Sequence, residues 1–201
     1  MKRAQTFPNL NLRFLLALYQ LIWFFGLPLM IFHLYMRCRK DRTYFKHLSL
    51  RFGFHRVRQE QNIWLHVVSL GEIRSVAPLI ERLMQRSKPI VTTHLTPAGL
   101  LEAERLFSAA VAEGRLKAYF VPLDYSLALK RFFKAFRPAY GLIMEVEAWP
   151  GMIMSSRKIK LPLFLRNVQY SAHGLKRDQK RYFSREKIVA GFSSVMVKSE
   201  H

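Results

Sequence analysis

Residues 63–72 read Ile63-Trp64-Leu65-His66-Val67-Val68-Ser69-Leu70-Gly71-Glu72, and this stretch decides the fold. Its first six residues form a short, mostly apolar run with the length and composition of a buried strand. A turn follows, and Glu72 then opens a segment whose apolar residues recur in steps of three and four, as on one face of a helix: Ile73, Val76, Ile80 and Leu83. The stretch therefore predicts a strand, a tight turn and a helix in succession.

The same cycle of strand and helix repeats along the rest of the chain. Further strands are expected at 89–93, 118–121, 140–144, 161–165 and 192–197, and helices at 97–111, 124–136, 149–157 and 172–186. Asp124 is expected to cap the helix that it begins. Strands that alternate with helices at this spacing are typical of parallel βαβ units with right-handed crossovers. The predicted fold class is α/β, a Rossmann-like parallel sheet of roughly five to six strands.

An apolar segment precedes this domain. Residues 14–36 contain no Asp, Glu, Lys or Arg, and about 20 such residues are enough to cross a bilayer as a helix. We expect an uncleaved transmembrane or membrane-anchoring helix, with a buried or re-entrant core helix as the alternative. Basic residues crowd the chain after this segment, which places the domain in the cytoplasm by the positive-inside rule. The expected organisation is a short N-terminal segment (1–13), the anchor (14–36), a basic juxtamembrane segment or solvated linker (37–61) and the Rossmann-like domain (62–201).

Composition limits the classes of function. The chain has 201 residues, is 50% hydrophobic and has a formal net charge of +20. A packed core is expected, because this apolar content offsets the entropy of folding. The single cysteine, Cys38, excludes an internal disulfide framework and a multi-cysteine zinc site. So basic a chain needs an anionic neighbour, and composition leaves open a nucleic acid, an anionic membrane surface and a phosphorylated substrate.

Candidate site residues follow the predicted strands. Ligands of open parallel sheets collect at the carboxyl ends of the strands, where this chain places Ser69, Gly71, Glu72, Thr93, Thr96, Glu145, Glu147, Trp149 and Asn167. Glu72 is interpreted either as a general base or as an ordinary first-turn acid that favours the helix dipole. Glu145 and Glu147 either stabilise developing charge or improve a helix N-terminus.

Motifs of the common cofactor sites are missing from the sequence. No Gly-x-Gly-x-x-Gly follows the first strand, and no Gly-Lys-Ser/Thr phosphate loop occurs. The seven histidines show no helical pair with metal-ligand spacing. We therefore expect no metal and no cofactor.

Four ordered motifs resemble one enzyme family. They read Ser69-Leu70-Gly71-Glu72, Val91-Thr92-Thr93-His94-Leu95-Thr96-Pro97-Ala98-Gly99, Val121-Pro122-Leu123-Asp124 and Met144-Glu145-Val146-Glu147-Ala148-Trp149-Pro150. Together with the N-terminal anchor and Arg51-Phe52-Gly53-Phe54, they resemble the N-terminal, acceptor-binding half of the 3-deoxy-D-manno-octulosonic acid (Kdo) transferases of lipopolysaccharide biosynthesis. The resemblance extends over essentially the whole chain. The chain departs from the family pattern at Val146, Ala148, Gly151 and 168–171.

The resemblance implies a membrane-associated inverting glycosyltransferase of GT-B architecture. Such enzymes transfer Kdo from CMP-Kdo to a phosphorylated lipid A precursor at the cytoplasmic side of the inner membrane. It implies that Glu72 is the proton acceptor and that Glu145 stabilises the transition state. Acceptor binding is expected from Ser69, Gly71, Thr93, Thr96 and Asn167, with Glu147 and Trp149 in structural or supporting roles. The C-terminal donor domain is expected to be absent, so that this chain is expected to be inactive alone.

Two other functions remain open from the sequence. One is a non-catalytic, membrane-tethered basic module that binds an anionic glycolipid. The other is nucleic-acid binding through the basic patches, which is not expected because the chain has no recognised nucleic-acid-binding module.

Overall fold

The computed structural model describes residues 8, 10–40, 48–55, 61–86, 88–145, 147–168 and 188–197. Within them, six parallel strands form a single sheet in the order β3-β2-β1-β4-β5-β6. The strands are β1 (Ile63–His66), β2 (Ile90–His94), β3 (Leu116–Phe120), β4 (Tyr140–Met144), β5 (Leu163–Val168) and β6 (Ser194–Val197). The predicted α/β, Rossmann-like fold class is confirmed.

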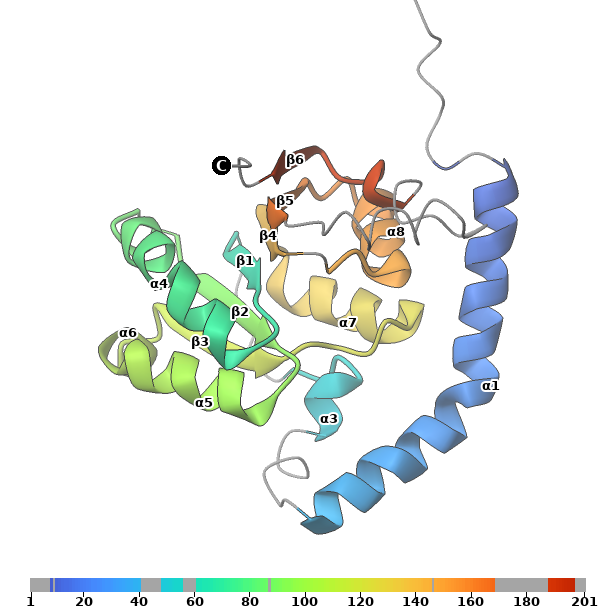
Figure 1. Cartoon of the computed structure of the whole chain (residues 1–201), viewed down its shortest axis with the longest axis horizontal. Coiled ribbons are helices and arrows are strands. Elements are labelled where there is room, and N and C mark those ends of the chain that lie inside the picture. Colours follow the sequence, from blue (N-terminus) through green and yellow to red (C-terminus); the bar gives the residue numbers. More distant parts are fainter. Residues whose placement is uncertain are drawn as a thin grey trace, which may run out of the picture.

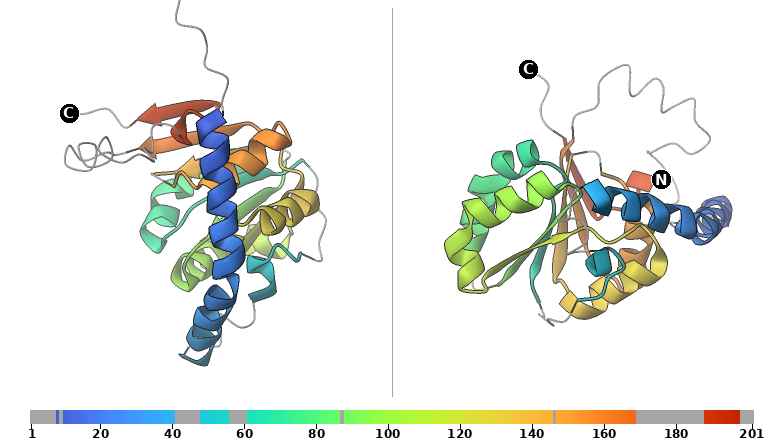
Figure 2. Two further views of the ribbon diagram at one scale, coloured as in Figure 1. Left: turned by 90° about the vertical axis from the view of Figure 1, so that its right-hand side faces the viewer. Right: turned by 90° about the horizontal axis from the view of Figure 1, so that it is seen from below.

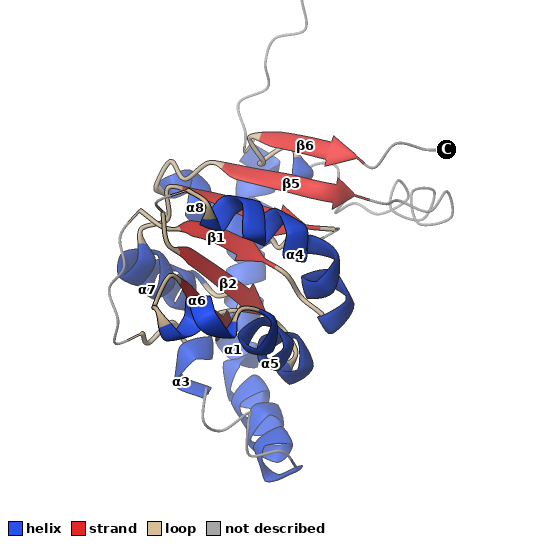
Figure 3. Cartoon of the chain, turned by 90° about the vertical axis from the view of Figure 1, so that its left-hand side faces the viewer, coloured by secondary structure: helices blue, strands red, loops and turns tan. Residues whose placement is uncertain are grey.

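Helices cover both faces of this sheet (Figures 1 and 3). They are α1 (Leu10–Lys40), α3 (Leu48–Arg51), α4 (Leu70–Met84), α5 (Pro97–Leu106), α6 (Ser108–Ala112), α7 (Ser126–Phe136) and α8 (Pro150–Lys158). Successive side chains of β1 enter two different apolar cores. Ile63 and Leu65 pack with α4 and α5, whereas Trp64 packs with α7 and α8. This alternation is expected for a buried strand, because successive side chains point to opposite faces.

The helix expected over 97–111 is divided in two. Phe107 lies between α5 and α6 with φ −113° and ψ 32°, outside the helical region. Its side chain is 5% exposed and belongs to the core shared with α4. Residues 100–111 contain no Pro or Gly that would break a helix, so the interruption is attributed to the packing of Phe107 in this core. The basic helix expected at 172–186 lies outside the described residues.

Asp124 does not cap the helix to which the sequence assigned it. Helix α7 begins at Ser126, and its N-cap position is occupied by Tyr125 without a side-chain hydrogen bond. The buried Asp124 carboxylate instead accepts from the backbone N–H groups of Gly151 (2.8 Å) and Met152 (2.6 Å), at the start of α8. The prediction for Asp124 was wrong, because a local pattern does not reveal that the open N-terminus of another helix lies nearby.

The apolar segment forms one long helix, α1, beside the domain. Residues Leu10–Arg37 are long and apolar enough to cross a membrane. Figure 2 shows that α1 runs along the flank of the domain that includes α8. Near its N-terminus, Leu12 and Leu16 are buried in the core shared with α7 and α8. The anchor expected from the sequence is therefore a helix whose N-terminal part packs against the domain.

A short helix, α3, closes the carboxyl end of β3. Arg51 is buried, stacks over the Phe120 ring at 4.3 Å and donates to the Leu95 carbonyl at 2.8 Å. Gly53 follows with φ 77°, a conformation that glycine adopts most readily. A Cβ at this position would collide with the carbonyl oxygen of Ala128 in α7. Glycine is therefore required for the close approach of this turn to α7.

Candidate functional site

The site is built around the pair of strands β1 and β4. These neighbours are parallel, with His66 opposite Ile143, and β2 lies on the other side of β1. The strand order therefore reverses between β1 and β4, which is the switch point where ligands of doubly wound sheets bind. Glu72 follows β1 and Glu145 follows β4, so that residues far apart in the sequence meet at one edge of the sheet.

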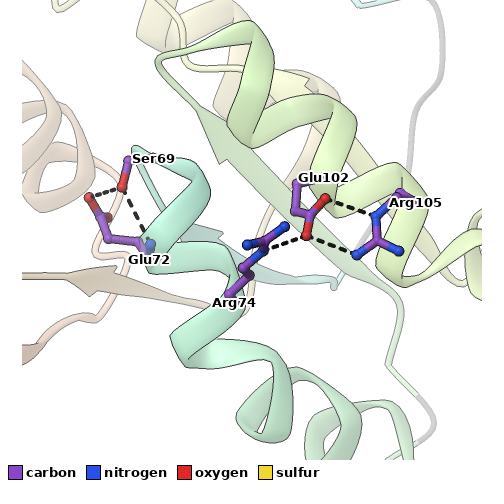
Figure 4. A network of polar contacts seen from close by, with 5 residues as sticks. All are labelled: Ser69, Glu72, Arg74, Glu102 and Arg105. Atoms are coloured by element: carbon purple, nitrogen blue, oxygen red, sulfur yellow. Dashed lines mark hydrogen bonds and ion pairs between the residues drawn. The ribbon is translucent and has the colours of Figure 1, made fainter.

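The turn after β1 is a hydrogen-bonded helix cap. The Ser69 hydroxyl accepts from the Glu72 backbone N–H (3.3 Å) and donates to one carboxylate oxygen of Glu72 (3.0 Å; Figure 4). The other carboxylate oxygen accepts from the Val68 N–H at 2.9 Å. This is a variant of the capping box, because the Glu72 carboxylate accepts from the N–H of Val68, the residue before the N-cap Ser69, and not from the N–H of Ser69 itself. Gly71 is exposed, with no atom within 4 Å of where a Cβ would stand, so the start of α4 is open to a ligand.

The surroundings of Glu72 increase its affinity for a proton. Burial raises the pKa of its carboxyl group, and the negative charges of Glu145 and Glu147 raise it further. The hydrogen bonds from Val68 and Ser69 act in the opposite direction, because they favour the ionised form. The net effect is a raised pKa, which makes Glu72 a stronger base than an ordinary surface glutamate.

The loop after β4 presents the two other acids. Glu145 is exposed and has φ 56°, a left-handed conformation that is uncommon for residues other than glycine. Such strained residues are frequent at functional sites. Glu147 accepts a short hydrogen bond from the Trp149 indole N–H, and the edge of Trp149 packs against the His66 ring at 5.2 Å. Trp149 thus fixes the loop over the end of β1.

Thr93 is buried below the carboxyl ends of the strands and is not exposed at the site. Its side chain is fully buried, accepts from the Trp64 indole N–H at 2.9 Å and lies 3.0 Å from His66 Nδ1. Burial lowers the pKa of His66 to about 3, with a further contribution from His94, so His66 is neutral near pH 7. The structure therefore gives Thr93 a role in holding the strands together, and its burial disfavours direct contact with a ligand.

Thr96 caps the next helix of the same layer. Its hydroxyl accepts from the Gly99 N–H at 3.2 Å and lies 3.4 Å from the Val68 carbonyl, to which it donates. A Cβ on Gly99 would stand 3.2–3.3 Å from the Ser69 and Val68 backbone. The starts of α4 and α5 are consequently locked together at the switch point.

A salt-bridge cluster joins the same two helices further along. Glu102 of α5 accepts from Arg74 of α4 at 2.7 Å and from Arg105 at 2.9 Å (Figure 4). These arginines hold the pKa of Glu102 at about 2, below its ordinary value. Glu102 is thus ionised and paired near pH 7, and it fixes α5 against α4.

Asn167, the remaining candidate residue, belongs to β5, but its side chain lies outside the described ones. Among the described residues, no group of three or more His, Cys, Asp or Glu side chains is arranged to hold a metal ion. The contribution of Asp124 to α8, which directly follows the loop of Glu145, Glu147 and Trp149, could not be predicted from the local sequence.

The fold and the site together define a Rossmann-like α/β domain with an acidic cluster at the switch point of its sheet. A model of the family "3-Deoxy-D-manno-octulosonic-acid transferase (kdotransferase)" matches residues 46–201. The chain belongs to this family, whose members are glycosyltransferases. The resemblance found in the sequence motifs is confirmed.

Individual relatives bear the same name. The chain is 35% identical over 138 residues to the 3-deoxy-D-manno-octulosonic acid transferase of Bordetella pertussis, a match that covers 69% of this chain and 32% of the relative. It is 28% identical over 155 residues to the enzyme of Haemophilus influenzae (75% and 35%). A probable mitochondrial 3-deoxy-D-manno-octulosonic acid transferase of Arabidopsis thaliana is 31% identical over 166 residues (82% and 36%). The chain spans about a third of the length of these relatives.

Proposed function

We propose that this chain provides the acceptor-binding half of an inverting Kdo transferase. In this proposal, Kdo moves from CMP-Kdo to a phosphorylated lipid A precursor at the cytoplasmic side of the inner membrane. The main support is the position of Glu72: a carboxylate with a raised pKa beside two further acids, at the switch point of the sheet.

Glu72 would act as the proton acceptor. A sugar hydroxyl is a weak nucleophile until a base removes its proton, and a base is most effective when its pKa lies near the working pH. An ionised carboxylate has about four lone-pair positions. Val68 and Ser69 occupy one on each oxygen, so both oxygens keep the capacity to accept from a substrate hydroxyl.

Glu145 would stabilise the transition state. Glycosyl transfer develops positive charge on the sugar ring, and a nearby carboxylate lowers the energy of that charge. Glu145 is exposed at the same edge of the sheet as Glu72, close enough that its charge raises the pKa of Glu72. In this proposal Glu147 and Trp149 hold the loop, and Ser69, Gly71, Thr96 and Asn167 contact the acceptor. Thr93 supports the edge from beneath.

Electrostatics suits a phosphorylated lipid acceptor. The net charge of +20 favours anionic partners, and the apolar helix α1 favours a membrane over a nucleic acid. We propose that CMP-Kdo is held mainly by a part of the relatives that lies outside their match to this chain. Residues 1–201 alone would then bind the acceptor without transferring Kdo.

One observation supports a second function, a non-catalytic module that binds an anionic glycolipid. The carboxylate of Glu72 is engaged in the capping box, so its position is also explained by helix stability alone. The two functions differ in whether transfer depends on the charge of Glu72.

A chimera tests this difference. Residues 1–201 would be joined to the remaining part of the Bordetella pertussis relative, and Kdo transfer from CMP-Kdo would be measured with and without Glu72→Gln. Glutamine still serves a capping box but is no base, so we expect the rate to fall by about 10²–10⁴ with little change in stability. Glu81→Gln, at an exposed position further along α4, is the control. An active chimera in which Glu72→Gln changes nothing would contradict the catalytic proposal and favour the binding module.

A further inference from the structure

We propose that Asp124 is a positioning residue for Kdo transfer, which holds the loop of Glu145 in place at the switch point and links this loop to α1. The role rests on the proposed function, in which Glu145 stabilises the transition state. Asp124 itself is 3% exposed and has no contact with either substrate in that proposal. It acts through three sets of contacts: those of Asp124 with α8, those of α8 with the loop, and those of Asp124 with α1.

Helix α8 takes its cap from a distant residue. Trp149 occupies the N-cap position and makes no capping hydrogen bond with its side chain. The first N–H groups of a helix have no partner within the helix, and Pro150 has no N–H. The N–H groups of Gly151 and Met152 donate to the two carboxylate oxygens of Asp124, at 2.8 and 2.6 Å. Asp124 therefore supplies the cap that the local sequence lacks, and its negative charge suits a helix N-terminus.

Close packing fixes the start of α8 on Asp124. A Cβ on Gly151 would stand 2.5 Å from the carbonyl oxygen of Asp124 and 2.7 Å from its Oδ1. Any larger residue at this position would push the helix away from the carboxylate. A buried carboxylate is costly without hydrogen-bond partners, so separation from α8 would destabilise Asp124 as well. The two elements are therefore held against each other from both sides.

The start of α8 in turn holds the loop of Glu145. Trp149 is the last residue before the helix; its indole N–H donates to Glu147, and its ring packs against the end of β1. Glu145, at the other end of the loop, donates its N–H to the Arg166 carbonyl of β5 at 2.8 Å. Its φ of 56° persists only where the surrounding structure holds it. The loop is thus fixed at one end by β5 and at the other by Asp124, through the start of α8.

Helix α1 contacts the same residue. The Tyr19 hydroxyl donates to the Asp124 carboxylate at 2.7 Å, and the Gln20 side-chain nitrogen donates to the Asp124 carbonyl at 3.4 Å. The Gln20 oxygen accepts from the Ser126 N–H (2.9 Å) and hydroxyl (2.7 Å). The Tyr19 hydrogen bond favours the ionised carboxylate, because it lowers the pKa of Asp124. An ionised carboxylate accepts stronger hydrogen bonds than a neutral acid, so the contact with α1 strengthens the cap of α8.

Asp124→Asn tests the positioning role in the chimera with the Bordetella pertussis relative. Asparagine keeps the size of the side chain, but its NH₂ group cannot accept, so one of the two hydrogen bonds to α8 is lost. We expect kcat per folded molecule to fall at least about tenfold, because small displacements of reacting groups are costly, while KM for CMP-Kdo and for the lipid substrate stays within about twofold.

Phe133→Leu is the matched control for lost stability. Phe133 is buried in the core on α7, so this variant weakens the same layer of the domain without contacting the loop, and its kcat per folded molecule should be unchanged. An Asp124→Asn chimera with wild-type kcat would overturn the inference, provided that Glu72→Gln lowers the rate. If Glu72→Gln also leaves transfer unchanged, the proposed function itself fails.

Tyr19→Phe tests the link to α1. This variant should lower kcat about threefold or more in the wild-type background and cause no further loss in the Asp124→Asn background, because contacts within one network are not additive. Tyr35→Phe, at an exposed position on the same helix, is the control. Additive losses for Tyr19→Phe and Asp124→Asn, or no loss for Tyr19→Phe alone, would contradict the link.

Hydrogen exchange of residues 1–201 in detergent micelles tests the same contacts without any activity. Peptides that cover 145–149 should exchange faster in Asp124→Asn and in Tyr19→Phe than in wild type, and Phe133→Leu should not have this effect. Faster exchange confined to 151–158, with the loop unchanged, would show a helix cap that does not position Glu145 and would overturn the inference.

Discussion

Replacing Tyr19 with phenylalanine tests the link between α1 and the domain. The change removes one hydroxyl, which donates to the Asp124 carboxylate at 2.7 Å, and leaves the ring in place. A hydrogen bond to a charged group contributes about 1.5–3 kcal/mol, whereas a neutral one contributes about 0.5–1.5 kcal/mol. We expect the free energy of unfolding to fall by about 2 kcal/mol near pH 8, where Asp124 is ionised.

The loss of stability caused by Tyr19→Phe should depend on pH through the ionisation of Asp124. Burial raises the pKa of Asp124, the Tyr19 hydroxyl lowers it, and the net value is about 6, above the ordinary 3.8. Because the folded-state pKa lies above the unfolded one, ionisation of Asp124 costs stability as the pH rises through 6, and Tyr19 reduces that cost. Below this pH the carboxyl is neutral. The loss caused by Tyr19→Phe should therefore shrink to about 1 kcal/mol near pH 5.

Guanidinium unfolding of the full chain in detergent micelles, followed by tryptophan fluorescence at both pH values, measures these losses. Tyr35→Phe is the control, because Tyr35 is on the same helix and 52% exposed. It should change the free energy of unfolding by less than about 0.5 kcal/mol. The same loss at both pH values, or none near pH 8, would refute the coupling of Tyr19 to an ionised Asp124.

Three shorter predictions concern other parts of the domain. Gly53→Ala should destabilise the fold by about 2 kcal/mol or more, because alanine is strained at φ 77° and its Cβ meets the Ala128 carbonyl; a thermal melt that matches wild type would contradict this. Thr93→Val removes the hydroxyl to which the buried Trp64 indole N–H donates, so it should cost about 1–3 kcal/mol of stability. The KM of the chimera for its lipid substrate should stay unchanged. A KM effect without loss of stability would show direct contact with the acceptor. The pairing of Glu102 is present above pH 4.5 and lost as the pH falls towards 2, so acid unfolding of wild type and Glu102→Gln should differ in slope across this range; parallel curves would rule out the pairing as a source of stability.

Short-range patterns predicted most of the fold. The strand at 140–144 is an apolar run between Pro138 and Glu145, and the observed β4 has the same bounds. Likewise, the rule that ligands gather at the carboxyl ends of parallel strands is enough to assign Glu72 and Glu145 to one edge of the sheet. These features depend on residues that are close in the sequence or on a general rule of topology.

Contacts between residues far apart in the chain could not be predicted from the sequence. Asp124 caps a helix by binding Gly151, 27 residues away, and Tyr19 reaches Asp124 across 105 residues. Nothing in the local pattern of residues 14–36 distinguishes a helix surrounded by lipid from one with a covered face. The break at Phe107 likewise comes from packing against α4 and not from a local signal.

The separation of Tyr19 and Gln20 from their partners also affects the order of events during synthesis. A ribosome adds about 5–20 residues per second, so Asp124 and Ser126 are made roughly 5–20 s after α1. For that interval the apolar helix exists without the partners of Tyr19 and Gln20. The nascent chain can therefore reach a membrane first and complete its domain there, and the hydrogen bonds of Tyr19 and Gln20 then form as a late step of folding.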